Sequence, residues 1–121
     1  MRISVILPVL NEESTIAPSL QAVSALGPHE IIVVDGGSTD LTRRISVEAG
    51  AKVLITGPGR ARQMNRGALA ATGDVLLFLH ADTRLPASAF RDIESALCEP
   101  HYLSGRFDVE LNSERRLLKV V

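Results

Sequence analysis

The sequence predicts an α/β fold in which a mostly parallel sheet is flanked by helices. Short runs of Val, Ile and Leu are continuous rather than alternating, which is typical of strands buried on both faces. These runs are residues 3–10, 30–35 and 74–79, with a weaker one at 51–56. Segments of helical length separate them, at about 12–26, 39–49 and 60–72. Strand–helix alternation at this spacing indicates successive βαβ units.

Residues at the segment ends predict where the first two helices begin. Asn11 is expected to cap the first helix, where the acidic Glu12 and Glu13 suit the positive helix start. Pro18 would start or kink that helix, because proline lacks the N–H that a helix interior needs. Ser38 is expected to cap the second helix.

The later segments carry similar signals. The third has apolar residues at helical spacing that are expected to face the core: Ala61, Met64, Ala68 and Ala71. Pro86 predicts the start of a fourth helix that ends near Cys98. Beyond it, residues 102–111 resemble a strand of mixed polarity, and residues 113–121 a short basic amphipathic helix.

Composition excludes several classes of protein. The 121 residues are 45% hydrophobic and 22% charged, the balance of a single globular domain. A net charge of −1 argues against non-specific nucleic-acid binding. One cysteine allows no internal disulfide and fits a reducing compartment, so we expect a cytoplasmic protein. No apolar run approaches the roughly 20 residues of a membrane span, although peripheral contact at the inner face of a membrane stays open.

Polar side chains follow each predicted strand. The segments concerned are 8–12, 35–40, 57–62 and 80–82. In open parallel sheets, ligands bind beyond the carboxyl ends of the strands, and all of these segments should therefore meet along one edge. Together they predict a ligand site more strongly than any one of them alone.

The segment after the second strand, "VVDGGSTD", has two interpretations. Asp35 lies before two glycines that let the backbone turn close to a ligand, so its carboxylate could accept from a base or a ribose. Alternatively, the segment is a strand-to-helix turn in which Ser38 and Asp40 only cap. We favour ligand contact for Asp35 and capping for Asp40. Neither the dinucleotide fingerprint nor a Walker A motif is present.

The segment "GPGRARQMNRG" favours phosphate binding. A helix start offers free N–H groups and a positive dipole, and Arg60 and Arg62 would add fork-shaped donors there. In the alternative interpretation both arginines are simply solvated, as we expect for Arg66.

The segment "LHADT" predicts a metal site. If the strand stays extended to Asp82, His80 and Asp82 point to the same face. A pair of ligands made of an imidazole nitrogen and a carboxylate oxygen suits Mn²⁺, whereas Mg²⁺ prefers oxygen ligands. With only two protein ligands, the metal would keep coordination positions open for substrate phosphates. Alternatively, His80 is a partly buried histidine bonded to backbone, so Asp82 is the stronger candidate.

With these segments in view, the chain resembles the family 2 glycosyltransferases, inverting enzymes of the Rossmann-like GT-A fold. The matching stretches are "SVILPVLNEE", "IIVVDGGSTDLT" and "GRARQMNRGALAATGDVLLFLHAD", in the family's order and spacing. The resemblance as a whole extends over about the first 105 residues. The last of them also resembles a subgroup of small bacterial family 2 enzymes without a defined substrate.

The resemblance implies roles for matching residues. Glu12 would lie near the ribose or base, Asp35 would accept from the base, and Arg60 would lie by the base or phosphates. Asp82 matches the second aspartate of the family's D-x-D motif, which holds Mn²⁺ or Mg²⁺ against the donor's diphosphate. The full predicted donor set is Pro8, Asn11, Glu12, Asp35, Gly37, Ser38, Arg60, Arg62, Asn65, His80, Ala81 and Asp82, with Asp82 and His80 as metal ligands.

The sequence departs from the family pattern at two positions. Gly36 stands where the family usually has a second aspartate near the ribose. His80 stands where D-x-D has its first aspartate, which puts the metal preference in question; His80 could instead contact the ribose or the diphosphate.

No residue matches the family's catalytic base, a carboxylate well beyond the D-x-D, although Asp108 and Glu110 are weak candidates. The chain also ends on the apolar "LLKVV". We therefore expect one domain, 1–121, that is incomplete at its C-terminus, with a donor-binding half at 1–100 and the start of an acceptor half at 101–121.

The predicted function is metal-assisted transfer of a sugar, hexosyl or related, from a nucleotide-diphosphate sugar to an unidentified acceptor. Three alternatives stay open. A nucleotidyltransferase of related fold would show a glycine-rich basic loop after the first strand, where this chain has the acidic "PVLNEE". A receiver-like signalling domain would need paired acids there and a late lysine. A donor-binding module without turnover would keep the site but lack the base. The sequence makes no prediction of oligomeric state.

Overall fold

The structure, a computed structural model, describes residues 1–97 and 116–120, with side chains described as far as residue 97. The elements in chain order are β1 (Ile3–Val9), α1 (Ile16–Ser24), β2 (Glu30–Asp35), α2 (Thr42–Glu48), β3 (Lys52–Ile55), α3 (Arg60–Ala70), β4 (Val75–Leu79), α4 (Ala89–Leu97) and β5 (Arg116–Val120).

The strands form one sheet in the order β3-β2-β1-β4-β5, and every neighbouring pair in it is parallel. This confirms the α/β fold with a parallel sheet that the continuous apolar runs predict. Because the strands are parallel, all their carboxyl ends lie along the same edge. The polar segments that follow the strands are thereby brought to that edge.

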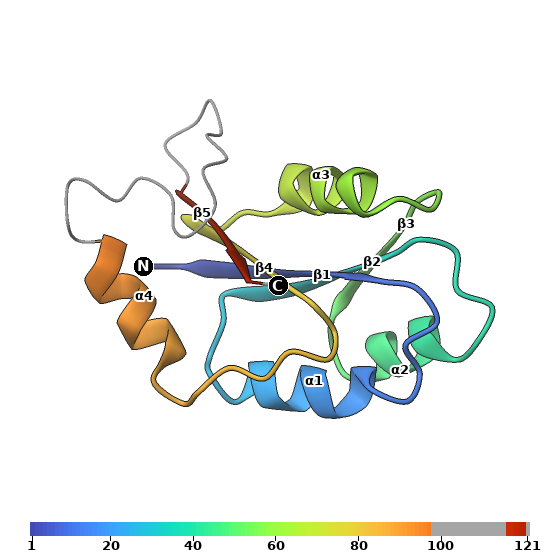
Figure 1. Cartoon of the computed structure of the whole chain (residues 1–121), viewed down its shortest axis with the longest axis horizontal. Coiled ribbons are helices and arrows are strands. Elements are labelled where there is room, and N and C mark those ends of the chain that lie inside the picture. Colours follow the sequence, from blue (N-terminus) through green and yellow to red (C-terminus); the bar gives the residue numbers. More distant parts are fainter. Residues whose placement is uncertain (98–115, 121) are drawn as a thin grey trace.

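Helices cover both faces of the sheet, with α1 and α2 on one side and α3 on the other (Figure 1). The chain steps from β1 to β2 to β3 in one direction and then returns past β1 to β4. Since βαβ crossovers are right-handed, this reversal of direction puts α3 on the face opposite α1 and α2.

Two apolar clusters lie between these layers. The larger one joins β1 and β4 to α1 through Ile16, Leu20 and Val23, and the partly buried Phe90 and Ile93 of α4 pack against it. The smaller one lies under α3 and includes Ile6, Ile32, Val34 and Phe78. Because both faces are covered, β4 is buried at every position.

The first helix starts later than predicted, at Ile16, and Asn11 does not cap it. Asn11 has a φ of 52°, whereas a capping residue adopts extended backbone. The chain makes a turn first, in which the carbonyl of Glu12 accepts the N–H groups of Thr15 and Ile16. Pro18 is tolerated because it lies in the first turn of α1, where an N–H has no partner within the helix.

The second and fourth helices also begin later than predicted. Ser38 does not cap α2; instead the carboxylate of Asp40 accepts the N–H of Thr42, the first residue of α2, at 2.9 Å. Asp40 therefore bonds the first N–H of α2 from one residue before the cap position, which Leu41 occupies. The fourth helix begins at Ala89, whose N–H is accepted by the carbonyl of Pro86 at 3.0 Å.

The third helix, α3, is close to its predicted range. Met64 and Ala68 pack on the smaller cluster, and Ala71, just past the helix, is 2% exposed. Ala61 is exposed and does not belong to the core stripe. Within residues 1–97 and 116–120, no helix has the length and apolar character needed to cross a bilayer.

The predicted helix at 113–121 is wrong, because Arg116–Val120 forms the parallel strand β5 against β4. In the register of this pair Val75 lies opposite Arg116 and Leu79 opposite Val120. The edge of β4 offers unpaired backbone groups, and ladder hydrogen bonds to them outweigh a weak local preference for helix. The strand predicted at 102–111, which includes Asp108 and Glu110, lies outside the described residues. The same holds for Cys98, the predicted end of the fourth helix.

A polar network at the amino edge joins the starts of the strands. Glu30, with its side chain 5% exposed, lies 2.7 Å from the ammonium of Lys52. It also accepts from the hydroxyl of Ser4 at 2.5 Å and the N–H of Thr72 at 2.6 Å. Burial alone raises the pKa of Glu30, but the hydrogen bonds from Lys52, Ser4 and Thr72 outweigh it and lower that pKa from 4.5 to about 2.

Acid is therefore expected to weaken the fold through Glu30. A carboxyl whose pKa is lower in the folded protein stabilises fully above its ordinary pKa of 4.5 and loses this contribution as the pH falls toward 2. Urea titrations should show the free energy of unfolding falling by about 2–3 kcal/mol between about pH 6 and pH 2 through this group. Glu30→Gln should remove that part of the pH dependence; an unchanged dependence would contradict the assignment.

Candidate functional site

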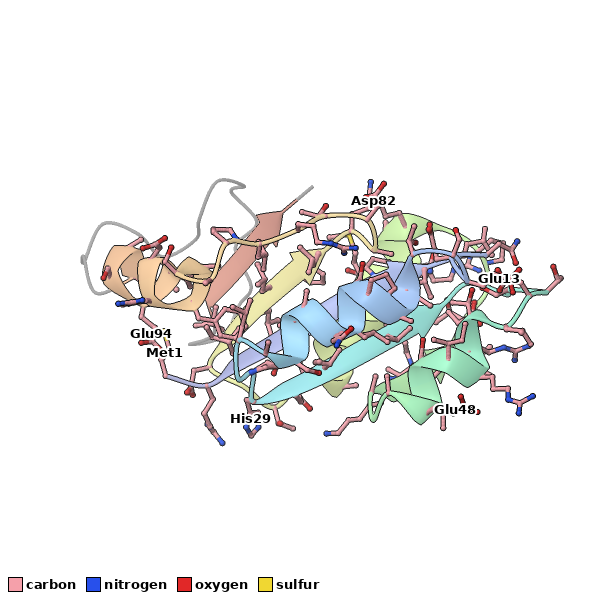
Figure 2. All side chains as sticks on the ribbon, turned by 90° about the horizontal axis from the view of Figure 1, so that it is seen from below. Met1, Glu13, His29, Glu48, Asp82 and Glu94 are labelled. Atoms are coloured by element: carbon pink, nitrogen blue, oxygen red, sulfur yellow. The ribbon has the colours of Figure 1, made fainter. Side chains whose placement is uncertain are left out.

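Most of the predicted site residues lie at or just beyond the carboxyl ends of β1, β2 and β4 or at the start of α3. The sheet changes its direction of winding between β1 and β4, the place where open α/β sheets bind ligands. Figure 2 shows Asp82 and Glu13 toward the carboxyl end of the strands, whereas Met1 and His29 lie toward the opposite end. The carboxyl edge is therefore the candidate functional site.

Asn11 joins the loop after β1 to the loop after β2. Its backbone N–H donates to the hydroxyl of Ser38 at 2.8 Å, and its side-chain oxygen accepts the N–H of Thr39 at 2.9 Å. The left-handed backbone of Asn11, with a φ of 52°, is one that asparagine tolerates better than most residues. The two predicted site residues Asn11 and Ser38 are thus in contact, and each helps to position the other loop.

The next residues extend this contact between the loops. The N–H of Glu12 donates to the hydroxyl of Thr42 at 2.8 Å, and the N–H of Glu13 donates to Asp40 at 3.2 Å. In return, the N–H of Leu41 donates to the carboxylate of Glu13 at 3.1 Å. Slight burial raises the pKa of Asp40, but hydrogen bonds from Thr42 and Glu13 outweigh it and hold that pKa below its ordinary value. The loops after β1 and β2 therefore form one interlocked wall.

Asp35, at the end of β2, is fully buried. Its Oδ1 accepts the N–H groups of Gly37 at 3.0 Å and Ser38 at 2.8 Å, which shapes the turn. Its Oδ2 lies 3.1 Å from Nε of Arg43, but off the N–H direction, so this buried oxygen accepts no hydrogen bond within the described residues. A base could reach Oδ2 only if covering atoms moved, and contact between Asp35 and a base stays a prediction.

The start of α3 carries the predicted phosphate contacts. Gly59 precedes the helix with a φ of 134°, a conformation that favours glycine. Arg60 and Arg62 are exposed there, and the guanidinium of Arg62 lies so close to Gly57 that a Cβ at Gly57 would be 2.7 Å from it. Asn65 is exposed about 200° around the helix from the sheet-facing Gln63, so the structure does not bring it to the strand ends.

His80 and Asp82 meet in a turn rather than on an extended strand. Strand β4 ends at Leu79, and the N–H of Thr83 donates to the carbonyl of His80 at 3.0 Å. The predicted extension of the strand to Asp82 is therefore wrong, yet the turn still places Nδ1 of His80 against Oδ1 of Asp82. The two side chains are 34% and 65% exposed, so a ligand can reach both.

Ser19 and Arg84, which are not in the predicted donor set, hold this turn in place. Ala81, between the two candidate ligands, is fully buried in the larger apolar cluster, so its side chain faces the core. The buried hydroxyl of Ser19 in α1 donates to the carbonyl of Ala81 and accepts from Arg84 at 2.8 Å. Ser19 and Arg84 therefore fix the turn that presents His80 and Asp82.

The residues present fit a divalent cation that shares its coordination with a ligand. An imidazole nitrogen and a carboxylate oxygen converge at an exposed turn, and both atoms are accepted metal ligands. No group of three or more His, Cys, Asp or Glu side chains within the described residues could hold a metal by itself. A cation bound here would therefore take its other ligands from water or from substrate phosphates.

Pro8 and Glu12 complete the predicted set. Pro8 is half-buried within β1, one residue before its end, and Glu12 is half-buried just beyond the strand. The carboxylate of Glu12 accepts from the hydroxyl of Thr15 at 3.1 Å. Gln63 and Arg43 also contribute to the candidate site, but the sequence does not predict them. Both act through contacts with residues far away in the sequence, for which no local sequence pattern exists.

The chain is similar in sequence to known glycosyltransferases. The sequence model described as Glycosyl transferase family 2 matches residues 4–118 of the chain. The chain belongs to this family. Among curated relatives, glucosyl-3-phosphoglycerate synthase of Mycobacterium tuberculosis (strain H37Rv) is 35% identical over 100 residues, which are 73% of this chain and 31% of the relative. An uncharacterized glycosyltransferase of Mycobacterium bovis is 35% identical over 86 residues, 70% of this chain and 38% of the relative.

Solved structures of the same synthase have the same fold. The M. tuberculosis enzyme in complex with uridine diphosphate (UDP) has a TM-score of 0.72 and 30% identity, over 84% of this chain and 42% of that one. Its complex with Mn²⁺, UDP and glucosyl-3-phosphoglycerate has a TM-score of 0.63 and 33% identity, over 69% and 35%. This family 2 chain thus has the GT-A fold, and it spans about a third of the length of the curated synthases it matches.

Proposed function

We propose that this chain forms the donor site of a metal-assisted glycosyltransferase that uses a nucleotide-diphosphate sugar. The observation that carries the proposal is the meeting of four polar strand ends at one edge of the sheet. There the structure presents the interlocked loops after β1 and β2, the arginine-bearing start of α3, and the His80–Asp82 pair. UDP is the favoured nucleotide, because the synthase structures similar to this chain contain UDP.

Each part of the edge suits one part of such a donor. The loops after β1 and β2, which Asn11 joins and Asp35 shapes, would form the wall against which the nucleoside lies. The start of α3 offers a positive dipole end and the guanidinium of Arg60 to the diphosphate. Mn²⁺ or Mg²⁺, held by Asp82 and His80, would supply positive charge that stabilises the departing nucleoside diphosphate.

The proposal concerns the donor side of the reaction. Residues 1–100 would form the donor-binding half, and 101–121 would begin the acceptor half of one larger domain. The match covers about a third of the synthase relatives. In a protein of their length, the acceptor-binding site and the carboxylate that deprotonates the acceptor would lie in the other two thirds.

Calorimetry with UDP, GDP and CDP in the presence of Mn²⁺ tests the proposal. We expect one nucleotide, UDP, to bind at least about tenfold more tightly than the other two, because base contacts differ while the diphosphate contacts are shared. Equal binding of all three would favour a general diphosphate site, and binding of none would exclude a donor site in this chain.

A further inference from the structure

Gln63 of α3 is a polar residue whose side chain is buried against the sheet. It is 5% exposed, and its side-chain amide donates to two backbone carbonyls, those of Val9 and Val34, at 2.9 Å each. Val9 ends β1 and Val34 is next to the end of β2, so one side chain from a helix bridges the tips of two neighbouring strands. Asp35 directly follows Val34, and Asn11 lies two residues after Val9.

Gly36 makes room for this bridge. A Cβ at Gly36 would lie 3.0 Å from Cδ and Oε1 of Gln63 and 3.1 Å from its Nε2, so the amide lies directly against the glycine backbone. The φ of Gly36 is not positive, so its backbone conformation does not by itself require glycine. Its neighbour Gly37 is the opposite case, with a φ of 113° and no atom within 4 Å of an added Cβ. At position 36 the amide of Gln63 leaves little room for a Cβ, whereas at position 37 the backbone conformation itself favours glycine.

Close docking of α3 explains how the amide reaches the strand ends. Gly67 lies one turn after Gln63 on the same side of the helix, and it is buried. A Cβ at Gly67 would lie 2.5 Å from Cγ2 of Ile6 and 3.1 Å from Cγ2 of Val34, so the helix rests almost directly on β1 and β2. The amide of Gln63 then pins the position of α3 along these strands, which apolar contacts alone specify less sharply.

We propose that Gln63 is a positioning residue of the donor site and that Gly36 is its steric partner. The bridge ties the wall beside the nucleoside to the helix start beside the diphosphate, so that both halves of the ligand meet a single fixed geometry. The inference rests on the proposed donor function and adds to it the residue pair that couples the two halves of the site.

A double-mutant cycle tests the pair. In calorimetry with UDP and Mn²⁺, Gly36→Ala should weaken binding about tenfold, because the new methyl displaces the amide. In the Gln63→Ala background the same change should cost less than about twofold, since the obstacle is gone. Gly37→Ala is the matched control, and its cost should be the same in both backgrounds. Additive effects of Gly36→Ala and Gln63→Ala would overturn the pairing.

A second readout separates positioning from simple stabilisation. At a temperature at which both proteins are fully folded, Gln63→Ala should weaken binding of UDP several-fold more than binding of uridine, because the start of α3 serves only the diphosphate. Gln21→Ala, an exposed glutamine of α1, should change neither affinity. A lower Tm with unchanged UDP affinity would overturn the positioning role. A wild-type protein that binds no nucleoside diphosphate would overturn the donor function as well, and the two failures are thereby distinguished.

Discussion

Asp82→Asn is expected to remove the Mn²⁺ dependence of UDP binding. The side chain of Asp82 is 65% exposed at a turn and lies against Nδ1 of His80, so it offers a carboxylate oxygen to a cation without breaking any contact of the core. Loss of outer-shell partners alone typically costs about 10–100-fold in metal affinity, and the loss of a ligand should cost at least as much. Titration of Mn²⁺ into the UDP-bound protein measures the effect.

The neighbouring helix offers a control for Asp82. Asp92 of α4 is also an exposed aspartate, and among the described residues its carboxylate accepts only from the hydroxyl of Ser88, at 2.9 Å. Asp92→Asn should leave UDP and Mn²⁺ binding unchanged, and both variants should unfold at the wild-type temperature because both sites are exposed. Should Asp82→Asn retain wild-type metal dependence, the metal assignment is wrong and the His80–Asp82 contact is structural.

Asp35→Ala is expected to lower the free energy of unfolding by about 2–4 kcal/mol, the cost of leaving buried partners without their hydrogen bonds and charge. Two backbone N–H groups, those of Gly37 and Ser38, would lose their acceptor, and the guanidinium of Arg43 would lose its carboxylate. UDP binding should fall as well, because the turn that this carboxylate shapes forms part of the nucleoside wall. Urea unfolding and calorimetry on the same samples measure the two effects.

Two adjacent arginines of α2 supply the control for Asp35. Arg43 pairs with the buried Asp35, whereas Arg44 pairs with Glu48, which is 65% exposed. Arg43→Ala should destabilise the fold because it leaves a buried carboxylate without a charge partner, while Arg44→Ala should change the free energy of unfolding by less than about 0.5 kcal/mol. Equal effects of the two substitutions would show that Asp35 does not depend on its ion pair.

The fold was readable from the sequence because it depends on continuous apolar runs. Strands β1, β2 and β4 are buried on both faces, and they therefore consist mainly of consecutive Val, Ile and Leu residues. The sequence predicts starts of α1 and α2 that are too early, because Asn11 and Ser38 bond to each other's loops rather than to a helix. The strand β5 was predicted as a helix, since its pairing with β4 is set by a distant partner and not by the local sequence.

The site was predictable to the extent that it follows the strand ends. Asp35, Arg60 and the His80–Asp82 pair could be selected from position alone, because parallel strands end at one edge. Gln63, Arg43 and Ser19 could not, because each acts through a contact with a residue far away in the sequence. The glycine at position 36 is intermediate: the sequence shows the departure from the family pattern, and the structure adds that the amide of Gln63 lies 3.0 Å from where a Cβ would stand.

Titration of UDP into this chain, once with saturating Mn²⁺ and once with EDTA, tests the central claim most directly. The claim is that the polar strand ends form a donor site in which a cation held by Asp82 and His80 shares the diphosphate with the start of α3. It predicts tight binding with Mn²⁺ and binding at least about tenfold weaker without it. Equal UDP affinity under both conditions, or no binding under either, would contradict it.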